Sequence, residues 1–288
     1  MDRLHQINPF VKRETHDPQT IFWYKILTTL SWLLAVLSSV FYTFHAPHDD
    51  VTKQRTIWGQ NKHHHTAFAL NSCIASIYWI VLFILQGGYI WHLFSANAEY
   101  VQAAASVGSH FIFNNLLHFA FVMLFVRSHF VWAELILIIN FFNLSSLYFR
   151  HPATPRFVHL PAVSGPLAWA FVALYWNGAI AFNAEGLFGR ILANVAVWGI
   201  LVYGLFFLVT FKDYTIGFSL SVLSASLGVG QFLRQVIAFQ WIFAFTIMAT
   251  LFVATIVITL PEIFGARFRR GETVVAEDQE RAPLLDDN

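Results

Sequence analysis

The chain has 288 residues, of which 57% are hydrophobic and only 11% are charged. Soluble domains usually carry about 25% charged residues, so this composition excludes a water-soluble globule covered by charged side chains. The net charge of +1 gives no indication of nucleic-acid binding, and the single cysteine, Cys73, excludes an internal disulfide.

Apolar residues occur in long blocks, and a helix that crosses a membrane needs about 20 of them. Eight such blocks predict helices over residues 21–44, 67–91, 104–126, 130–148, 159–182, 191–211, 214–231 and 236–260. The predicted fold class is therefore an all-α integral membrane protein, a bundle of about eight transmembrane helices. Seven is the alternative, because the seventh block is short and rich in Ser and Gly.

Prolines and a short basic turn refine these boundaries. The third and fourth helices should form a tight hairpin through residues 127–129. In the fifth block, Pro166 predicts the start of the regular helix and Ser164 its N-cap. Pro161 lies before that start, and Pro261 predicts the end of the eighth helix.

Three segments follow from this pattern: a cytoplasmic N-terminal segment (1–20), a transmembrane domain (21–260) and a cytoplasmic tail (261–288) with too little apolar content to fold. The polar start and the long first block argue against a cleaved signal peptide. With the N-terminus inside, ten Lys and Arg fall on the cytoplasmic side and six outside. The positive-inside rule therefore predicts that both termini are cytoplasmic.

Polar residues inside the third and fourth helices are candidates for ligand binding, because such groups are costly in a membrane and often functional. The candidates are His110, Asn114, His118, Glu134, Asn140 and Asn143. The first three share one helical face. Two interpretations stay open: a buried polar pocket for a ligand, ion or proton, or interhelical hydrogen bonds that hold the bundle together. Asn is a weak ligand for most transition metals, so no metal site is predicted.

Small residues form a stripe on the seventh helix at Gly217, Ser221, Ser224 and Gly228. Close helix packing is the expected use, and a substrate path is the alternative.

The loop after the first helix is rich in histidine and aspartate: His45, His48, Asp49, Asp50, His63, His64 and His65. These residues could bind a transition metal or titrate in an acidic lumen, or they could form a solvated polar loop. Their spacing matches no zinc motif.

No motif of a metalloprotease, nucleotide-binding loop, serine hydrolase or CxxC redox site is present, so no catalytic residue and no cofactor are predicted. The leading hypothesis is a non-enzymatic protein that binds or transports a small apolar or amphipathic ligand. One alternative is an intramembrane lipid-modifying enzyme with His110, His118 and Glu134 as acid–base groups. The other is a structural or trafficking protein. Membrane lipids are expected partners of all three.

The tail contains a candidate sorting signal, in which Glu280 precedes Leu284 and Leu285. This spacing is similar to the acidic dileucine motif that clathrin-adaptor complexes read. It predicts an endosomal or vacuolar location, with the histidine-rich loop facing the lumen.

Five stretches carry a family resemblance: INPFVKRET, SIYWIVLFILQGGYIWHLF, GSHFIFNNLLHFAFVMLFVRSHFVWAELILIINFFNLSSLYFRH, SGPLAWAFVALYWNGA and FKDYTIGFSLSVLSASLGVGQF. They resemble a family of fungal multi-pass membrane proteins known only as a domain of unknown function, which implies no activity. The order of blocks is also similar to long tryptophan-rich sensory proteins of the TspO type, although the WxPxF-type signature is absent. That second resemblance implies a helical bundle with a small hydrophobic-ligand pocket.

Overall fold

Helices make up most of the computed structural model, which describes residue 10 and residues 15–49, 54–151, 155–183, 186–234 and 239–280. No strand occurs among these residues. The helices are α2 (Pro18–Phe44), α3 (Ile57–His63), α4 (Ser72–Leu93), α5 (Ala98–Ala105), α6 (Gly108–Val126), α7 (Phe130–Arg150), α8 (Arg156–His159), the π-helix η1 (Leu160–Ser164), α9 (Gly165–Ala181), α10 (Leu187–Ala196), α11 (Trp198–Phe211), α12 (Tyr214–Arg234) and α13 (Gln240–Glu280).

Within the described part of the chain, eight helical stretches are long and apolar enough to cross a membrane. Two of them are composite, because Arg156–Ala181 joins α8, η1 and α9, and Phe188–Phe211 joins α10 to α11. The short seventh block forms a full span of 21 residues, α12. The prediction of an all-α bundle of eight apolar helices is therefore confirmed, and seven is wrong.

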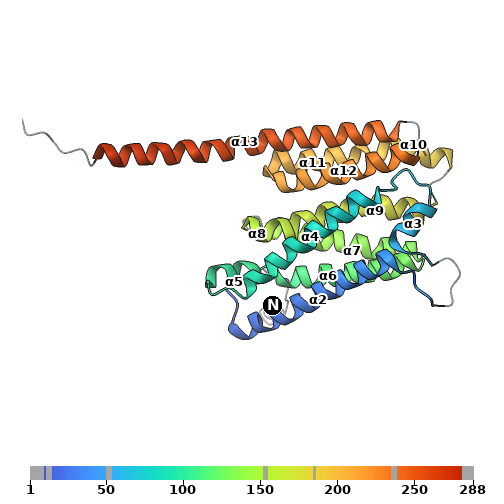
Figure 1. Cartoon of the computed structure of the whole chain (residues 1–288), viewed down its shortest axis with the longest axis horizontal. Coiled ribbons are helices and arrows are strands. Elements are labelled where there is room, and N and C mark those ends of the chain that lie inside the picture. Colours follow the sequence, from blue (N-terminus) through green and yellow to red (C-terminus); the bar gives the residue numbers. More distant parts are fainter. Residues whose placement is uncertain are drawn as a thin grey trace, which may run out of the picture.

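The spans lie side by side with similar directions (Figure 1). α11, α12 and α13 pack together on one side of the bundle, and α2, α6 and α7 on the other. α12 also packs against α4 and α9, which lie between the two groups. The largest fully buried side chains include Trp176, Tyr89 and Phe125.

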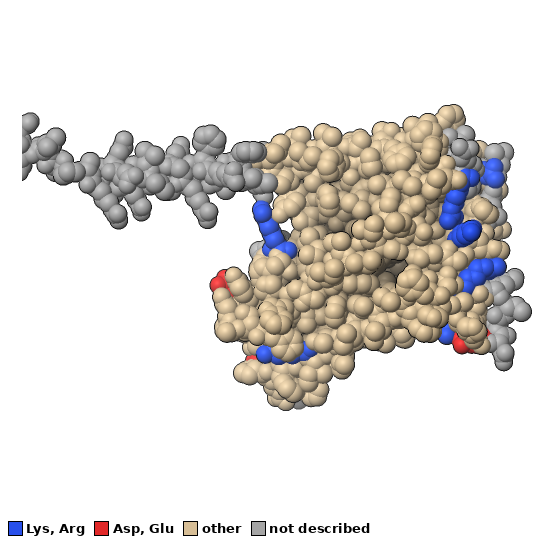
Figure 2. All heavy atoms as spheres, in the orientation of Figure 1, with Lys and Arg blue, Asp and Glu red and all other residues tan. Residues whose placement is uncertain are grey.

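The surface is divided by polarity along the helix direction. Lys and Arg gather at the two ends of the bundle, and a broad band without them lies between (Figure 2). Large apolar side chains are exposed along the spans, for example Leu37, Ile84 and Val209. Water-soluble monomers rarely expose apolar patches beyond a few hundred Å², so this band is suited to lipid chains.

The start of the fifth span differs from the prediction, because the chain is already helical from Arg156 onward. The regular helix α9 begins at Gly165, one residue before the predicted start, and Ser164 occupies its N-cap position. Ser164 has helical backbone angles and its side chain makes no cap hydrogen bond, so it does not act as a cap. The chain forms a π-turn at these prolines, in which Gly165 N–H donates to Leu160 O, five residues back. A widened turn accommodates prolines that would break the regular hydrogen-bond ladder.

α13 continues to Glu280 and does not end at Pro261 as the sequence predicted. A proline inside a helix loses one ladder hydrogen bond and crowds the carbonyl four residues before it, at a cost of about 3 kcal/mol, but here the helix continues past it. Leu284 and Leu285 of the candidate sorting signal lie outside the described residues.

The segment from α3 to the start of α4 folds onto one end of the bundle. Asn61 Nδ2 donates to Leu70 O at 2.8 Å, and its Oδ1 accepts from Leu70 N–H at 3.1 Å and from Trp176 Nε1 at 2.9 Å. Arg234 donates to Asn61 O. Because residues 66–71 are held in this way, α4 begins at Ser72, five residues later than predicted, with Asn71 as its N-cap.

Candidate functional site

The predicted polar face of the third and fourth spans forms pairs between α6 and α7. His110 Nδ1 lies 2.8 Å from Asn143 Oδ1, and Asn143 Nδ2 donates to His110 O. Asn140 Nδ2 donates to Asn114 Oδ1 at 2.9 Å. These four buried side chains line none of the pockets described below, so their geometry is that of interhelical hydrogen bonds.

The other two candidates lie apart from these pairs. His118 lines a pocket between α2 and α4, and Glu134 lines a different pocket beside α9 and α10. His110, His118 and Glu134 each have different partners, so the structure does not bring together the acid–base groups that the enzyme alternative requires.

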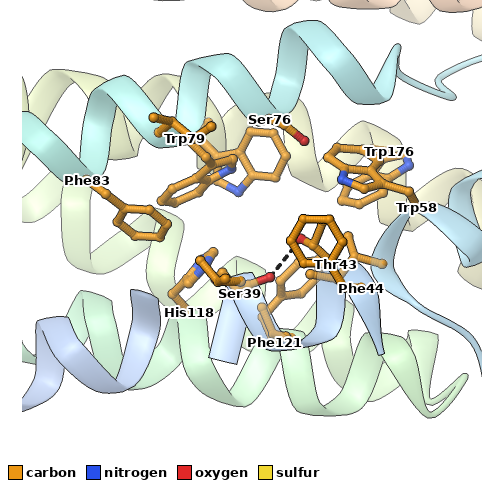
Figure 3. A pocket seen from close by; sticks show the side chains of 15 residues that line it. Ser39, Thr43, Phe44, Trp58, Ser76, Trp79, Phe83, His118, Phe121 and Trp176 are labelled. Carbon is orange, nitrogen blue, oxygen red and sulfur yellow. Dashed lines mark hydrogen bonds between the residues drawn. The ribbon is translucent and has the colours of Figure 1, made fainter. Parts of the chain in front are cut away.

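The α2–α4 pocket has a volume of about 280 Å³, close to the lower end of the range for small-molecule sites. Four tryptophans form much of its wall: Trp58 from α3, Trp79 from α4, and Trp169 and Trp176 from α9. Figure 3 shows Trp79 and Trp176 on one side of the pocket, with Ser39 and His118 across from Trp79. Its wall is almost wholly apolar and aromatic.

Lipid-facing residues form the rim of this pocket. Val40 and Phe44 on α2 and Ile80 on α4 all line it, and each side chain is more than half exposed. Figure 2 shows a hollow on this face, in the part of the apolar band where α2 and α4 run in Figure 1. A ligand could therefore enter sideways from the bilayer.

A small polar group lies inside the aromatic wall. His118 Nε2 lies 2.9 Å from Ser39 Oγ, and the imidazole packs at a tilt of 36° against Trp79, with ring centroids 4.4 Å apart. Two pocket-lining indoles, Trp58 and Trp169, have buried Nε1–H groups with no hydrogen-bond acceptor among the residues that the structure describes. The pocket thus combines a large apolar surface with a few polar groups, which is the usual composition of a small-molecule site.

Sequence reasoning did not single out these tryptophans. Trp79 lies in the middle of its helix, away from the interfaces where tryptophan is enriched. Trp169 and Trp176 are seven residues apart, so two helical turns place them on one face. The position of Trp79 within its span and the seven-residue spacing of Trp169 and Trp176 are the sequence features that could have indicated an aromatic pocket wall. By contrast, Trp23 and Trp91 are exposed near helix ends, as an interfacial belt requires.

The small-residue stripe of α12 faces its neighbours in the bundle. A Cβ added at Gly217 would meet Leu208 and Thr255, and one at Gly228 would meet the Phe245 ring. Ser221 Oγ donates to Met248 O at 3.0 Å, and Ser224 is buried. These contacts place α11 and α13 against the stripe.

The histidine-rich loop pairs with other segments where it is described. Asp49 forms an ion pair with Arg127, and the His64 ring packs edge-on against Phe130. Within the described ranges, no three His, Cys, Asp or Glu side chains are grouped so as to hold a metal.

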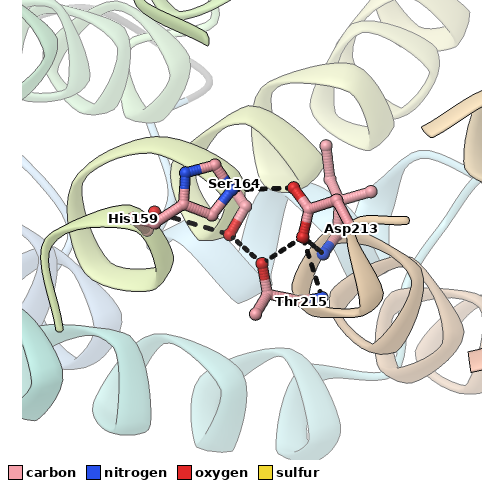
Figure 4. A network of polar contacts seen from close by, with 5 residues as sticks. His159, Ser164, Asp213 and Thr215 are labelled. Atoms are coloured by element: carbon pink, nitrogen blue, oxygen red, sulfur yellow. Dashed lines mark hydrogen bonds and ion pairs between the residues drawn. The ribbon is translucent and has the colours of Figure 1, made fainter. Parts of the chain in front are cut away.

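A second polar cluster lies at the opposite end, where η1 meets α12 (Figure 4). His159 Nε2 lies 2.7 Å from Asp213 Oδ2, Asp213 Oδ1 accepts from Thr215 N–H and Oγ1, and Thr215 Oγ1 lies 2.7 Å from Ser164 Oγ. A catalytic triad needs the imidazole between the serine and the carboxylate. Here Thr215 occupies that place, so the arrangement joins helices and does not activate Ser164.

The helix bundle, the apolar band and the lipid-facing pocket define an integral membrane protein with eight spans. Residues 190–285 match the model of a family described as "Fungal protein of unknown function (DUF1774)", which confirms the first resemblance. An uncharacterized protein of Schizosaccharomyces pombe is 28% identical over 244 residues, which cover 82% of this chain and 87% of that protein. No solved structure matches. These comparisons give no support to the resemblance to tryptophan-rich sensory proteins.

Proposed function

We propose that this membrane protein binds or transports a small, mainly apolar ligand in the α2–α4 pocket. The observation that carries the proposal is a pocket with four tryptophans that opens between lipid-facing side chains and contains the His118–Ser39 pair. A ligand with an apolar body and one hydroxyl or carbonyl group suits it. The body would contact the indoles, and the polar group would reach Ser39 or His118.

A pocket-filling substitution tests this proposal. Ser76 on α4 lines the pocket and is half-buried, so Ser76→Leu adds apolar volume inside it. A long-chain alcohol with a brominated chain quenches nearby tryptophan fluorescence, and it should quench the purified protein in detergent saturably. We expect Ser76→Leu to weaken the apparent affinity about tenfold or more, because the ligand would lose its space.

Cys73→Leu is the matched control, because Cys73 is exposed on the same helix and outside the pocket wall. It should leave the saturable quenching unchanged. Equal quenching in the wild type and both variants would mean that the alcohol meets only lipid-facing tryptophans, and the proposal would be rejected.

We also propose that both termini face the cytoplasm and that the tail directs the protein to endosomes or the vacuole through a clathrin adaptor. The support is the Lys and Arg asymmetry between the two sides and the spacing of Glu280, Leu284 and Leu285.

Changing Leu284 and Leu285 together to alanine tests the sorting signal. The tagged variant should move from the endosomal or vacuolar membrane to the Golgi or plasma membrane, because an adaptor would lose its two apolar contacts. Fluorescence imaging beside an organelle marker measures this. Changing Asp286 and Asp287 to alanine is the control and should leave the location unaltered. An unaltered location in the leucine variant would remove the signal from consideration.

A further inference from the structure

We propose that the pocket around Glu134 is a second ligand site, separate from the α2–α4 pocket, and that it binds an amphipathic amine through its ammonium group. Glu134 is the only Asp or Glu within the eight apolar spans. A carboxylate in an apolar membrane is costly unless a partner compensates its charge, so such residues usually mark functional sites.

Glu134 has little compensation from the protein itself. Asn177 Nδ2 donates to Glu134 Oε2 at 2.8 Å, and the same amide nitrogen donates to Phe130 O at 2.9 Å. Across the described ranges, Glu134 Oε1 accepts no hydrogen bond and no Lys, Arg or His forms an ion pair with the carboxylate. One oxygen is thus held in position and the other is left for a donor.

The surroundings of this oxygen leave space. A Cβ added at Gly178 would lie 3.2 Å from Glu134 Oε1, so the glycine keeps the helix wall open beside the carboxylate. The pocket has a volume of about 350 Å³, and besides Glu134 of α7 it is lined by apolar and aromatic residues of α9 and its C-terminal end, of α10 and of the loop before α4. Phe182 and Leu192 on its rim are more than half exposed, so it opens toward lipid.

The aromatic wall favours a cation over a neutral donor. Phe68 and Tyr175 both line the pocket, with ring centroids 5.1 Å apart. Aromatic rings within about 6 Å attract an ammonium group. Glu134 is the fifth residue of α7, roughly 6 Å along the axis from the first. An amine held there would keep its head near the interface and its chain in the bilayer, as amphipathic amines do.

Dodecylamine is the probe, and dodecanol is its uncharged counterpart with the same chain. Both are added to the full chain in detergent, in the Ser76→Leu background, so that the α2–α4 pocket does not contribute. The midpoint of thermal unfolding should rise saturably with dodecylamine and not with dodecanol. In Glu134→Gln the apparent affinity for dodecylamine should fall about tenfold or more, because a charge-assisted hydrogen bond is lost.

A second pair of variants tests the same amine site in case Glu134→Gln does not fold. Ala196 lines the pocket from α10, whereas its neighbour Val195 is exposed outside it. Ala196→Phe should abolish the dodecylamine effect, and Val195→Phe should preserve it. Lysophosphatidylethanolamine, which carries its ammonium on a phospholipid headgroup, distinguishes the source: stabilisation by it as well would assign the site to lipid headgroups, and stabilisation by dodecylamine alone to free amines.

Equal stabilisation by dodecanol, or an amine effect that survives both Glu134→Gln and Ala196→Phe, would overturn the proposal. No amine effect in any form of the protein would also overturn it, and would leave Glu134 as a structural partner of Asn177. None of these outcomes bears on the α2–α4 pocket, which carries the Ser76→Leu substitution in every sample.

Discussion

Asp213→Ala should lower the free energy of unfolding by about 3 kcal/mol, roughly 1 from the lost helix cap and 2 from hydrogen bonds to a charged group. Asp213 is only 8% exposed and lies in the connection between α11 and α12. Its Oδ1 accepts from the backbone N–H groups of Thr215 and Ile216 at the start of α12. Its Oδ2 contacts His159 at 2.7 Å and so ties α12 to α8. Chemical denaturation in detergent micelles measures the loss.

Asp213→Asn is the informative control. Its side-chain oxygen can still cap α12, but it carries no charge for His159, so about two thirds of the loss should remain. An alanine variant as stable as the wild type would show that the cluster in Figure 4 contributes nothing to folding.

Acid should weaken the same contact. Burial raises the pKa of Asp213. The hydrogen bond and charge of His159, together with the hydroxyls of Thr215 and Tyr148, lower this pKa by more than burial raises it, so it lies below its ordinary value. The stabilisation is then complete above about pH 4 and is lost as pH falls through the folded-state pKa. Asp213→Ala should remove this component of acid sensitivity.

Local sequence patterns were sufficient to predict the spans, but they were insufficient to predict the contacts between the spans. Block length predicts eight helices, because each span alone must satisfy its backbone hydrogen bonds and its lipid contacts. Asp213 was missed because its partner, His159, lies 54 residues away in sequence. The pairing of His110 with Asn143 could not be distinguished from a pocket, because that depends on the rotation of α6 against α7.

The two pockets show the same limit. Glu134 stood out as an acidic residue in an apolar block, but its aromatic neighbour Phe68 comes from a segment predicted to be helical that folds as a loop. Trp79 and Trp169 meet with ring centroids 5.2 Å apart although they are 90 positions apart. Helical spacing predicts a face, and only packing decides what that face meets.

The loop from Thr66 to Asn71 leads to the other large expected effect. It lies against α12, where Asn71 N–H donates to Ser226 O at 2.9 Å and Gln231 Nε2 donates to Ala69 O at 3.1 Å. A Cβ added at Gly230 would lie 2.5 Å from Ala69 O and 2.8 Å from Asn71 N. These are backbone atoms, so no side-chain rotation can relieve the clash.

Gly230→Ala should therefore destabilise the protein by about 3 kcal/mol, the upper part of the usual range for overpacking. The loop must move away from α12, and the hydrogen bonds between them would lengthen together. Because Asn61 joins this loop to Trp176, the saturable quenching by the brominated alcohol should weaken as well. Gly88→Ala on α4 is the control: a Cβ there meets nothing within 4 Å, so it should be neutral or stabilise by up to about 1 kcal/mol. If both variants unfold at the same denaturant concentration as the wild type, the loop can move away from α12 without a loss of stability. The loop then does not determine the packing at this end of the bundle.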